Sequence, residues 1–335
     1  MQLEFRTQNK TLINDVNTFI KEWHSSASTV TVTTSGSTGT PKAIELRKHY
    51  MIESAKMTGK FLGLKAGDHA LLCLSPNTIA GKMMIVRSII LGLKLIVTDI
   101  NSHPLKEIDE RIDFIALVPL QLKNTLQNLR EQLSAISSVI VGGGAISNDL
   151  RVAAAQLPNK LFQTFGMTET ISHVALREVR EENNSYHALP GVHFSIEKGN
   201  LVIHAPYLGI EHLLTNDSIE ILSDHEFKWL GRSDFVINSG GIKIHPEEIE
   251  SQLSELIVSP FFSVGLDDET LGQKHVLCIE GNKENKLNKT SFRLLSAFLI
   301  PKEIYYFDSF AYTESNKINR METLKFLVNA KKKVL

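Results

Sequence analysis

Hydrophobic residues recur with two different periods at the start of the chain. Leu12, Val16, Phe19 and Trp23 lie three or four positions apart, which predicts an amphipathic helix over residues 11–24. Valine and threonine alternate in the next segment, which predicts a short strand over residues 29–33. One helix and one strand are therefore expected before residue 34.

Apolar strands then alternate with helical patterns as far as residue 165. The predicted strands are 69–74, 94–98, 113–118, 138–142 and 160–165, and the predicted helices are 47–62, 80–91, 120–133 and 147–156. This alternation is typical of an α/β fold, in which helices cover a largely parallel sheet. We therefore expect a large N-terminal α/β domain.

The pattern changes after about residue 171. Short alternating segments predict strands at 192–197, 201–204, 219–222 and 227–230, which would form a β-rich closing subdomain. Residues 1–231 are expected to form the large domain, with a hinge near Asp234. Residues 232–335 are expected to form a small mobile α+β lid domain.

The lid is predicted to contain three helices and three central strands. The helices are 246–256, 290–299 and 321–332, and the strands are 262–266, 275–280 and 304–307. The basic run Lys331–Lys333 is expected at the solvated end of the last helix, where positive charge complements the helix dipole.

Composition excludes several classes of function. The chain has 335 residues, 42% of them hydrophobic and 22% charged, with a formal net charge of -1, so nothing favours nucleic acid as a partner. No apolar run reaches the ~20 residues of a membrane span. The N-terminus does not resemble a secretory signal, and we expect a cytoplasmic protein. Cys73 and Cys278 lie in apolar runs, which favours buried, inert thiols.

The segment Thr34–Lys42 carries the strongest chemical signal. Its candidate phosphate-binding residues are Thr34, Ser35, Gly36, Ser37, Thr38, Gly39 and Lys42. Glycines let backbone N–H groups approach a phosphate, hydroxyls donate hydrogen bonds, and the lysine adds positive charge. The spacing differs from the P-loop pattern Gly-x4-Gly-Lys-Ser/Thr. Taken alone, the segment also fits a polar surface loop.

Five further segments follow in an order that resembles the adenylate-forming superfamily of acyl- and aryl-CoA ligases, luciferases and peptide-synthetase adenylation domains. They are Val141–Ala145, Phe165–Glu169, Thr215–Asp217, Gly231–Asp234 with Asn238–Gly241, and Lys317 within Glu314–Arg320. Within that superfamily, Leu117–Leu122, Ser239–Glu250 and Asp234 are most similar to the o-succinylbenzoate–CoA ligases of menaquinone biosynthesis.

The resemblance implies a two-step reaction with ATP, Mg²⁺ and CoA. A carboxylic acid would form an acyl-adenylate with release of pyrophosphate, and the acyl group would then pass to CoA. Lys317 would contact the reacting carboxylate and α-phosphate when the lid is closed. Glu169 would bind Mg²⁺, with a hydroxyl from Thr38 or Thr168. Taken alone, Glu169 also fits an acidic residue at the start of a helix.

The resemblance also implies the nucleotide and CoA contacts. The residues implied are Gly143, Gly144, Ala145, Phe165, Gly166 and Met167 near adenine, Asp217 and Arg232 at the ribose, and Ser239, Gly240 and Gly241 along CoA. Structural alternatives stay open for three of them. Phe165 also fits a core aromatic residue, Asp217 a turn residue, and the Gly240–Gly241 segment a turn that enters a helix.

The acyl pocket is expected to include Thr78, Lys82, Ser172 and His173. Lys82 or Arg87 would pair with the second carboxylate of a dicarboxylic acid, although either also fits a helix residue that extends its charge to solvent. The chain departs from the superfamily pattern at Thr78, which replaces histidine, and at Asn238 and Asn316, which replace lysine and glycine.

The phosphate-type segment begins earlier than in the superfamily, so the fold is expected to be shortened at its N-terminus. An apolar sheet face left uncovered would favour a homodimer. Two alternatives to the proposed ligase stay open. One is an adenylating enzyme for another acid or for a carrier-protein thiol, and the other is a non-catalytic nucleotide sensor.

Overall fold

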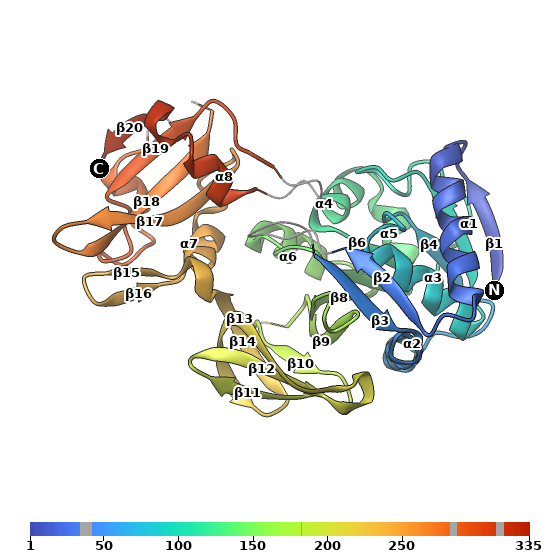
Figure 1. Cartoon of the computed structure of the whole chain (residues 1–335). Helices are drawn as coiled ribbons and strands as arrows, with labels where there is room; N and C mark the ends of the chain where they lie inside the picture. Colours follow the sequence, from blue (N-terminus) through green and yellow to red (C-terminus); the bar gives the residue numbers. More distant parts are fainter. Residues whose placement is uncertain (34–41, 182, 282–286, 313–317) are drawn as a thin grey trace.

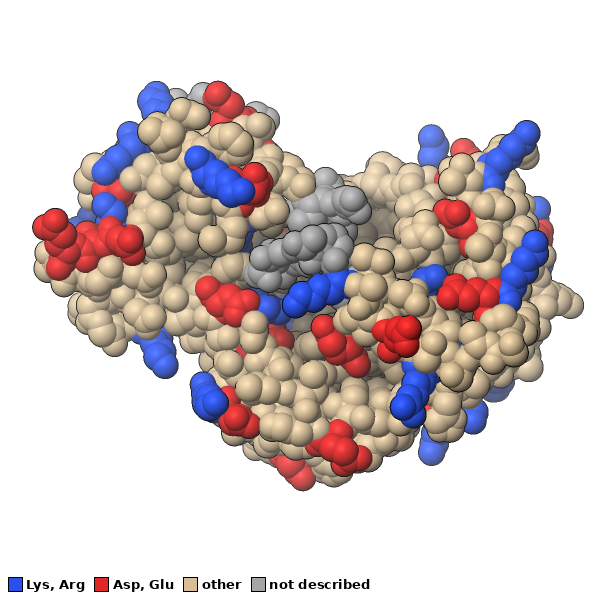
Figure 2. Space-filling view, viewed as in Figure 1, with Lys and Arg blue, Asp and Glu red and all other residues tan. Residues whose placement is uncertain are grey.

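The computed structural model describes residues 1–33, 42–181, 183–281, 287–312 and 318–335 (Figure 1). Within these ranges the fold is mixed α/β, as the sequence predicts, with a twelve-stranded sheet, a six-stranded sheet and a separate hairpin. No helix in the described part of the chain is long and apolar enough to cross a membrane. Acidic and basic side chains are interspersed on the face shown in Figure 2, in keeping with the small net charge.

Six parallel strands form the first half of the large sheet. In spatial order they are β1 (Gln2–Arg6), β5 (Lys94–Thr98), β4 (His69–Leu72), β6 (Phe114–Leu117), β7 (Ser138–Val141) and β8 (Lys160–Gly166). The central strands are almost fully buried, which explains their continuous apolar runs, because helices cover both faces of a parallel sheet.

Alternate residues of these strands enter two hydrophobic clusters. Ala70 and Leu72 pack with α1 (Lys10–His24), α2 (Lys48–Leu62) and α3 (Ile79–Leu91) on one face. Leu71 and Cys73 pack with α4 (Pro119–Asn128), α5 (Arg130–Ala135) and α6 (Asn148–Ala155) on the other. The helix expected over 120–133 is thus two helices, because Leu129 at φ −139°, ψ 42° interrupts it.

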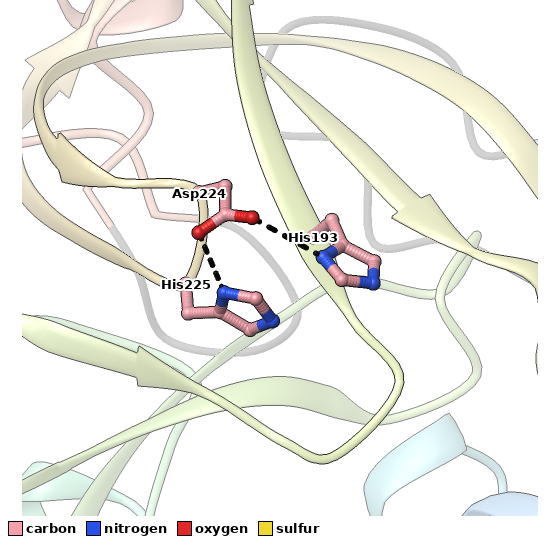
Figure 3. Close-up of side chains that lie close together, drawn as sticks. All are labelled: His193, Asp224 and His225. Atoms are coloured by element: carbon pink, nitrogen blue, oxygen red, sulfur yellow. Dashed lines mark hydrogen bonds and ion pairs between the residues drawn. The ribbon is translucent and has the colours of Figure 1, made fainter.

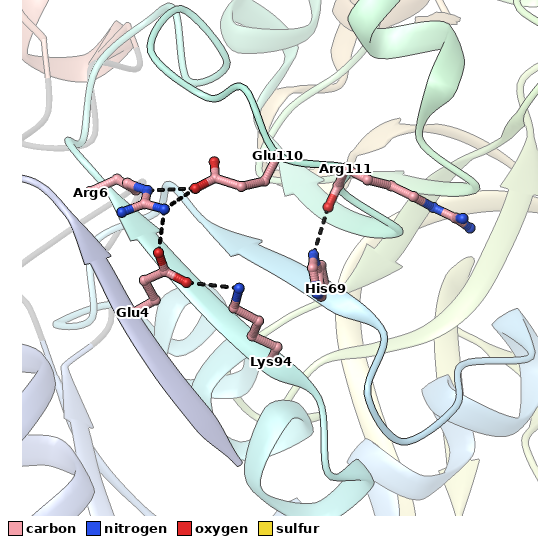
Figure 4. Close-up of polar contacts among 6 residues, drawn as sticks. All are labelled: Glu4, Arg6, His69, Lys94, Glu110 and Arg111. Carbon is pink, nitrogen blue, oxygen red and sulfur yellow. Dashed lines mark hydrogen bonds and ion pairs between the residues drawn. The ribbon is translucent and has the colours of Figure 1, made fainter.

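The first strand was not expected from the sequence. It lies at one edge of the sheet, where charged side chains hold it (Figure 4). Lys94 pairs with Glu4 at 2.8 Å between Nζ and Oε2, and Arg6 pairs with Glu110. The Lys94 hydrogen bond is the main reason why the pKa of Glu4 is lowered. Charges along an edge strand also discourage pairing with other chains.

Antiparallel strands continue the same sheet beyond β8. In order they are β9 (His173–Glu178), β10 (Tyr186–Ala188), β14 (Glu226–Arg232), β13 (Ile210–Ser223), β12 (Asn200–Ala205) and β11 (His193–Glu197), with a 3-10 turn, η1, at Pro206–Leu208. The hairpin of β2 (Thr29–Thr33) and β3 (Ala43–Arg47) stands apart from it. The closing β region is therefore joined to the α/β region by hydrogen bonds between β8 and β9.

Residues after 236 build the six-stranded sheet and gather into a separate lobe (Figure 1). Its elements are β15 (Ile237–Ser239), β16 (Ile242–Ile244), α7 (Pro246–Leu253), β17 (Phe261–Asp268), β18 (Gly272–Glu280), η3 (Lys289–Phe292), β19 (Glu303–Phe307), α8 (Arg320–Leu324), η4 (Leu327–Asn329) and β20 (Lys331–Val334), after η2 (Ser233–Phe235). The lobe has two apolar clusters of its own.

Two predicted helices of this lobe are wrong. Only the 3-10 turn at 289–292 forms within 290–299, and α8 ends at Leu324 instead of continuing to 332. The basic run at 331–333 lies in β20, which pairs with β19 and places Lys332 Nζ 2.7 Å from Glu303 Oε1. On the side of β19 that faces away from β18, backbone N–H and C=O groups are available for hydrogen bonds with residues 331–334. This pairing with β19 outweighs the local preference of these residues for a helix.

Candidate nucleotide and acyl site

The glycine turn after β7 lies beside the end of β8. Parallel pairing of these strands brings their carboxyl ends to one edge of the sheet, where α/β proteins bind ligands. Gly143 has φ +79°, a left-handed conformation that side chains disfavour, and Gly143, Gly144 and Ala145 are exposed. Gln163 of β8 donates from Nε2 to the Gly144 oxygen at 3.4 Å. The structure therefore brings the two predicted adenine segments together.

Phe165 belongs partly to the core. Its ring meets the edge of Phe227 at 5.0 Å between centroids and lies 5.6 Å from Tyr186. These contacts support the alternative that Phe165 is a core aromatic residue. The side chain is half-buried, so part of it is also accessible to a flat ligand. Aromatic pairs of this kind fix the orientation of each ring.

The turn from Met167 to Ser172 is tightly closed between β8 and β9. A Cβ atom on Gly166 would lie 2.3 Å from the Ser172 oxygen, so only glycine fits there. Thr170 Oγ1 accepts from Met167 N at 2.9 Å and donates to the Ser172 oxygen at 2.7 Å. Glu169 is exposed in this turn and Thr168 is half-buried. The alternative that Glu169 begins a helix is wrong.

Asp217 is held as a buried carboxylate inside a strand. It lies in β13, in register with Arg232 of β14, and its Oδ1 accepts from Trp229 Nε1 at 2.8 Å. Burial raises the pKa of Asp217, while the Trp229 bond and the charge of Arg232 oppose that change. The turn alternative for Asp217 is therefore wrong. Sequence reasoning missed Trp229, which stands twelve residues away and is aligned only by the hairpin.

The predicted hinge segment joins the two sheets. Arg232 donates to Asp234 at 2.8 Å between Nη2 and Oδ2, and Ser233 Oγ donates to the Asn216 oxygen at 3.1 Å. Arg232 Nε is buried without a hydrogen-bond partner among the described residues. These contacts tie the segment to the Asp217 strand; its motion as a hinge stays a prediction.

An ion-pair cluster behind the hinge was not foreseen. Arg320 donates from Nη2 to Glu250 Oε2 at 2.8 Å and lies 3.7 Å from Glu247 Oε1. Burial raises the pKa of Glu250 to about 7, opposed by Arg320. Arg320 follows Lys317 by three positions, so the cluster anchors the C-terminal side of the segment that carries the predicted catalytic lysine.

The residues predicted for the acyl pocket belong to a polar cluster formed by α2, α3 and the turn that leads into β9. Arg87 is 2% exposed and donates from Nη2 to Ser172 Oγ, while its Nε has no partner among the described residues. Ser172 Oγ lies 3.3 Å from His173 Nδ1, and His173 Nε2 lies 3.3 Å from Thr58 Oγ1. The sequence predicts Ser172 and His173 here, but gives no sign of Thr58.

Burial controls the charges of this cluster. It lowers the pKa of Arg87 to about 10, which still leaves the guanidinium charged at neutral pH. Burial, and then the charge of Arg87, hold the pKa of His173 well below its usual value. His173 is therefore neutral near pH 7, and Arg87 carries the positive charge of the cluster.

Thr78 and Lys82 make structural contacts. Thr78 caps α3, with its Oγ1 accepting from Gly81 N at 3.3 Å and donating to the Ser75 oxygen at 2.8 Å. Lys82 Nζ lies 4.2 Å from the Phe19 ring centroid and 3.8 Å from Glu22 Oε2. Burial lowers the pKa of Lys82. Lys82 is only 8% exposed, so the alternative that it extends its charge to solvent is wrong, and the substrate roles of Thr78 and Lys82 stay predictions.

The glycines expected along CoA lie in the β15–β16 hairpin. Gly240 N donates to the Leu271 oxygen at 2.9 Å, and the strands pair from Ile237 with Ile244 to Ser239 with Ile242. The helix α7 begins only at Pro246, so these glycines turn a hairpin and do not enter the helix directly.

Several predicted residues lie outside the described part of the chain. They are Thr34, Ser35, Gly36, Ser37, Thr38, Gly39 and Lys317. Lys42 is described and is exposed just before β3. Antiparallel pairing of β2 with β3, ending at Thr33 with Ala43, fixes the two ends of the phosphate-type segment.

Comparison with known proteins identifies the family. The model of the AMP-binding enzyme family matches residues 6–200, more than half of the chain. The chain belongs to the AMP-binding enzyme family. The sequence resemblance to the adenylate-forming superfamily is thereby confirmed, and the protein is an enzyme of this family.

Curated relatives have a consistent name. The 2-succinylbenzoate–CoA ligase of Bacillus cytotoxicus is 25% identical, over 92% of this chain and 72% of that protein. The probable 2-succinylbenzoate–CoA ligase of Mycobacterium tuberculosis is 30% identical, over 74% of this chain and 70% of that protein. A similar ligase of Bacillus pumilus is covered over only 66% of its length. The chain thus spans about two thirds to three quarters of these curated relatives.

Two solved structures show the same fold. An acyl-CoA synthetase (AMP-forming)/AMP-acid ligase II-like protein from Dyadobacter fermentans is 35% identical, with a TM-score of 0.64 over 96% of both chains. The o-succinylbenzoate CoA synthetase of Bacillus subtilis, in complex with its acyl-adenylate intermediate, has a TM-score of 0.77 at 22% identity, over 87% of this chain and 68% of that one. At that identity the second likeness shows the fold alone.

Proposed function

We propose that this AMP-binding enzyme is an ATP- and Mg²⁺-dependent acid–thiol ligase. It would join a carboxylic acid to AMP with release of pyrophosphate, and then transfer the acyl group to CoA. The observation that carries the proposal is the nucleotide side of the site: Asp217, held by Trp229 in register with Arg232. A buried carboxylate fixed in this way is suited to accept hydrogen bonds from sugar hydroxyls.

The first step requires positive charge and fixed geometry. A carboxylate oxygen attacks the α-phosphorus, and the bond to pyrophosphate breaks, so negative charge gathers on the phosphate oxygens. Lys42 and the segment 34–39 are proposed to hold the departing pyrophosphate. Glu169, exposed in its turn, is proposed to hold Mg²⁺, which prefers oxygen ligands and keeps several waters. Lys317 is proposed to contact the reacting carboxylate.

The acid is proposed to be an aromatic dicarboxylate, with o-succinylbenzoate as the best candidate. Arg87 supports this assignment, because it is a buried cation whose Nε has no protein partner among the described residues. A second carboxylate on the substrate would supply the missing acceptor and compensate the buried charge. The names of the curated relatives point to the same acid.

The acceptor is proposed to be CoA, which would pass along the Ser239–Gly241 hairpin turn. The alternatives are another aryl or acyl acid, a carrier-protein thiol, and a non-catalytic nucleotide sensor. The chain retains Lys42, Glu169, Asp217, Arg232 and Lys317, which favours catalysis over sensing.

ATP–pyrophosphate exchange with a panel of acids tests the proposal. We expect exchange with o-succinylbenzoate that depends on Mg²⁺, followed by thioester formation with free CoA. Exchange at background with every acid would support the sensor. Exchange followed by transfer only to a phosphopantetheinyl carrier would replace CoA as the acceptor.

We also propose the division into a domain of residues 1–231 and a lid of residues 232–335, and a homodimer. The separate apolar clusters of the C-terminal lobe support the first proposal. Light scattering that shows a monodisperse monomer at micromolar concentration would refute the homodimer.

A further inference from the structure

Histidines gather on the closing β region, at positions to which the proposed function assigns no role. Five of the twelve histidines of the chain fall between residues 187 and 225. Two of them, His193 of β11 and His225 of the β13–β14 turn, flank the carboxylate of Asp224 (Figure 3). All three side chains are exposed, and the proposed reaction uses none of them.

The three side chains converge on one point. His225 Nδ1 lies 2.6 Å from Asp224 Oδ1, and His193 Nδ1 lies 3.7 Å from Asp224 Oδ2, so each imidazole faces a different oxygen of the same carboxylate (Figure 3). Their candidate ligand atoms all lie within 4.8 Å of one another. Two ligands about 2.05 Å from a tetrahedral metal ion are roughly 3.3 Å apart, so small shifts of these side chains suffice to enclose one.

The backbone that carries these ligands is held in place. Phe194 N donates to the Asp224 oxygen at 2.7 Å, and Ala188 N donates to the His225 oxygen at 2.8 Å. Phe194 is also buried and meets the edge of the Phe227 ring at 4.8 Å between centroids. The β11 strand and the β13–β14 turn therefore keep a fixed separation without a metal ion. A site whose ligands are already positioned loses little conformational entropy when it binds.

We propose that His193, Asp224 and His225 form a surface site for a late divalent transition-metal ion, with Zn²⁺ as the best fit. Two imidazole nitrogens and one carboxylate oxygen are typical of zinc and of its neighbours nickel and copper, and they are a poor match to the all-oxygen preference of Mg²⁺. Water would complete the coordination. The bound ion would link edge strand β11 to the turn and stabilise the closing β region.

Zinc binding by the full chain, prepared without a histidine tag and freed of metal with a chelator, tests the site. Isothermal titration without nucleotide avoids competition from phosphate groups. We expect one Zn²⁺ per chain, and a loss of affinity of roughly tenfold or more in each of His193→Asn, Asp224→Asn and His225→Asn. Zn²⁺ should also raise the Tm of the wild type but not that of the His193→Asn/His225→Asn double variant.

His212→Asn is the matched control, because His212 is an exposed histidine of the same sheet whose Nε2 lies 3.0 Å from Glu197 Oε2. This variant should bind Zn²⁺ as the wild type does. The proposal is overturned if the wild type binds no stoichiometric Zn²⁺, or if the double variant binds it equally well. Because none of these residues belongs to the proposed ligase site, ATP–pyrophosphate exchange by the variants checks the ligase proposal separately.

Discussion

Two buried charges of opposite sign belong to the proposed nucleotide and acyl sides of the site, and their hydrogen bonding within the protein differs. Asp217, on the nucleotide side, accepts from Trp229 and lies in register with Arg232. Arg87, on the acyl side, contacts Ser172 and the sulfur of Met84, and its Nε has no hydrogen-bond partner among the described residues. Asp217 thus has its hydrogen-bond donor within the chain, whereas Arg87, like Arg232 beside Asp217, keeps a buried Nε with no partner among the described residues.

We infer from this difference that Asp217 would serve nucleotide binding, whereas Arg87 would determine which acid is accepted. A carboxylate with its protein partners in place presents one fixed geometry to any nucleotide of the right shape. A buried cation with few partners is costly, so it discriminates strongly for a substrate that brings the missing negative charge. In the proposed function, Asp217 would therefore hold the nucleotide, while Arg87 would select the acid.

The largest effect is expected at a third charge, the predicted catalytic Lys317. Lys317→Ala should lower ATP–pyrophosphate exchange by roughly 100- to 1,000-fold, because one donor to the developing charge is lost. Thioester formation from a pre-made acyl-adenylate should stay nearly unchanged. Equal losses in both half-reactions, measured separately by rapid quench, would contradict the assigned role.

Arg87→Met should remove the acyl-side charge with little change in volume. We expect kcat/KM for o-succinylbenzoate to fall about 10- to 150-fold, because a charged hydrogen bond contributes about 1.5–3 kcal/mol. Activity with a monocarboxylic aromatic acid should fall much less. The free energy of unfolding should stay the same or rise, since a buried charge with few partners is removed. A similar loss of kcat/KM with both acids would show that Arg87 does not bind the second carboxylate.

Changes on the nucleotide side should show the opposite pattern. Trp229→Phe removes the donor to Asp217 and should destabilise the fold by about 1–2 kcal/mol in urea unfolding, because a buried acceptor loses its bond. It should also raise the KM for ATP several-fold, with no preference among acids. If Trp229→Phe altered the choice of acid while Arg87→Met altered the KM for ATP, the division between the two sides would be wrong.

The smallest expected effect is a pH dependence of stability. The pKa of His173 is well below its usual value, and that of His275 is lowered to about 4, so the unfolded chain binds more protons than the folded one below about pH 6.5. Stability due to these groups is therefore lost as the pH falls below about 6.5. At pH 5.5 each should cost about 1.4 kcal/mol.

Urea unfolding of the wild type and of His173→Gln at pH 7.5 and 5.5 measures this loss. The variant should lose less stability on acidification than the wild type. An identical pH dependence in wild type and His173→Gln would show that this histidine is not held neutral.

Sequence periodicity was most successful where helices and strands are long and regular. The helix at 11–24 and the strand at 94–98 match α1 and β5 closely, because their burial follows from their own residues. The secondary structure of the C-terminal lobe was harder to predict, since Lys331–Val334 forms a strand only by pairing with β19, which is distant in the sequence. Thr58 likewise gave no local sign of its contact with His173, because 115 positions separate them.

The sequence by itself determined the α/β class and the order of the motifs, because glycine spacing, hydroxyl content and hydrophobic period are local properties, and the resemblance of those motifs to the adenylate-forming superfamily implied the chemistry. Only the tertiary structure decided which charges have partners. Strand register joined Asp217 to Trp229, the β8–β9 turn placed Ser172 on Arg87, and the sheet brought His193 to Asp224 and His225. Long-range pairing sets these distances, and no local pattern encodes them.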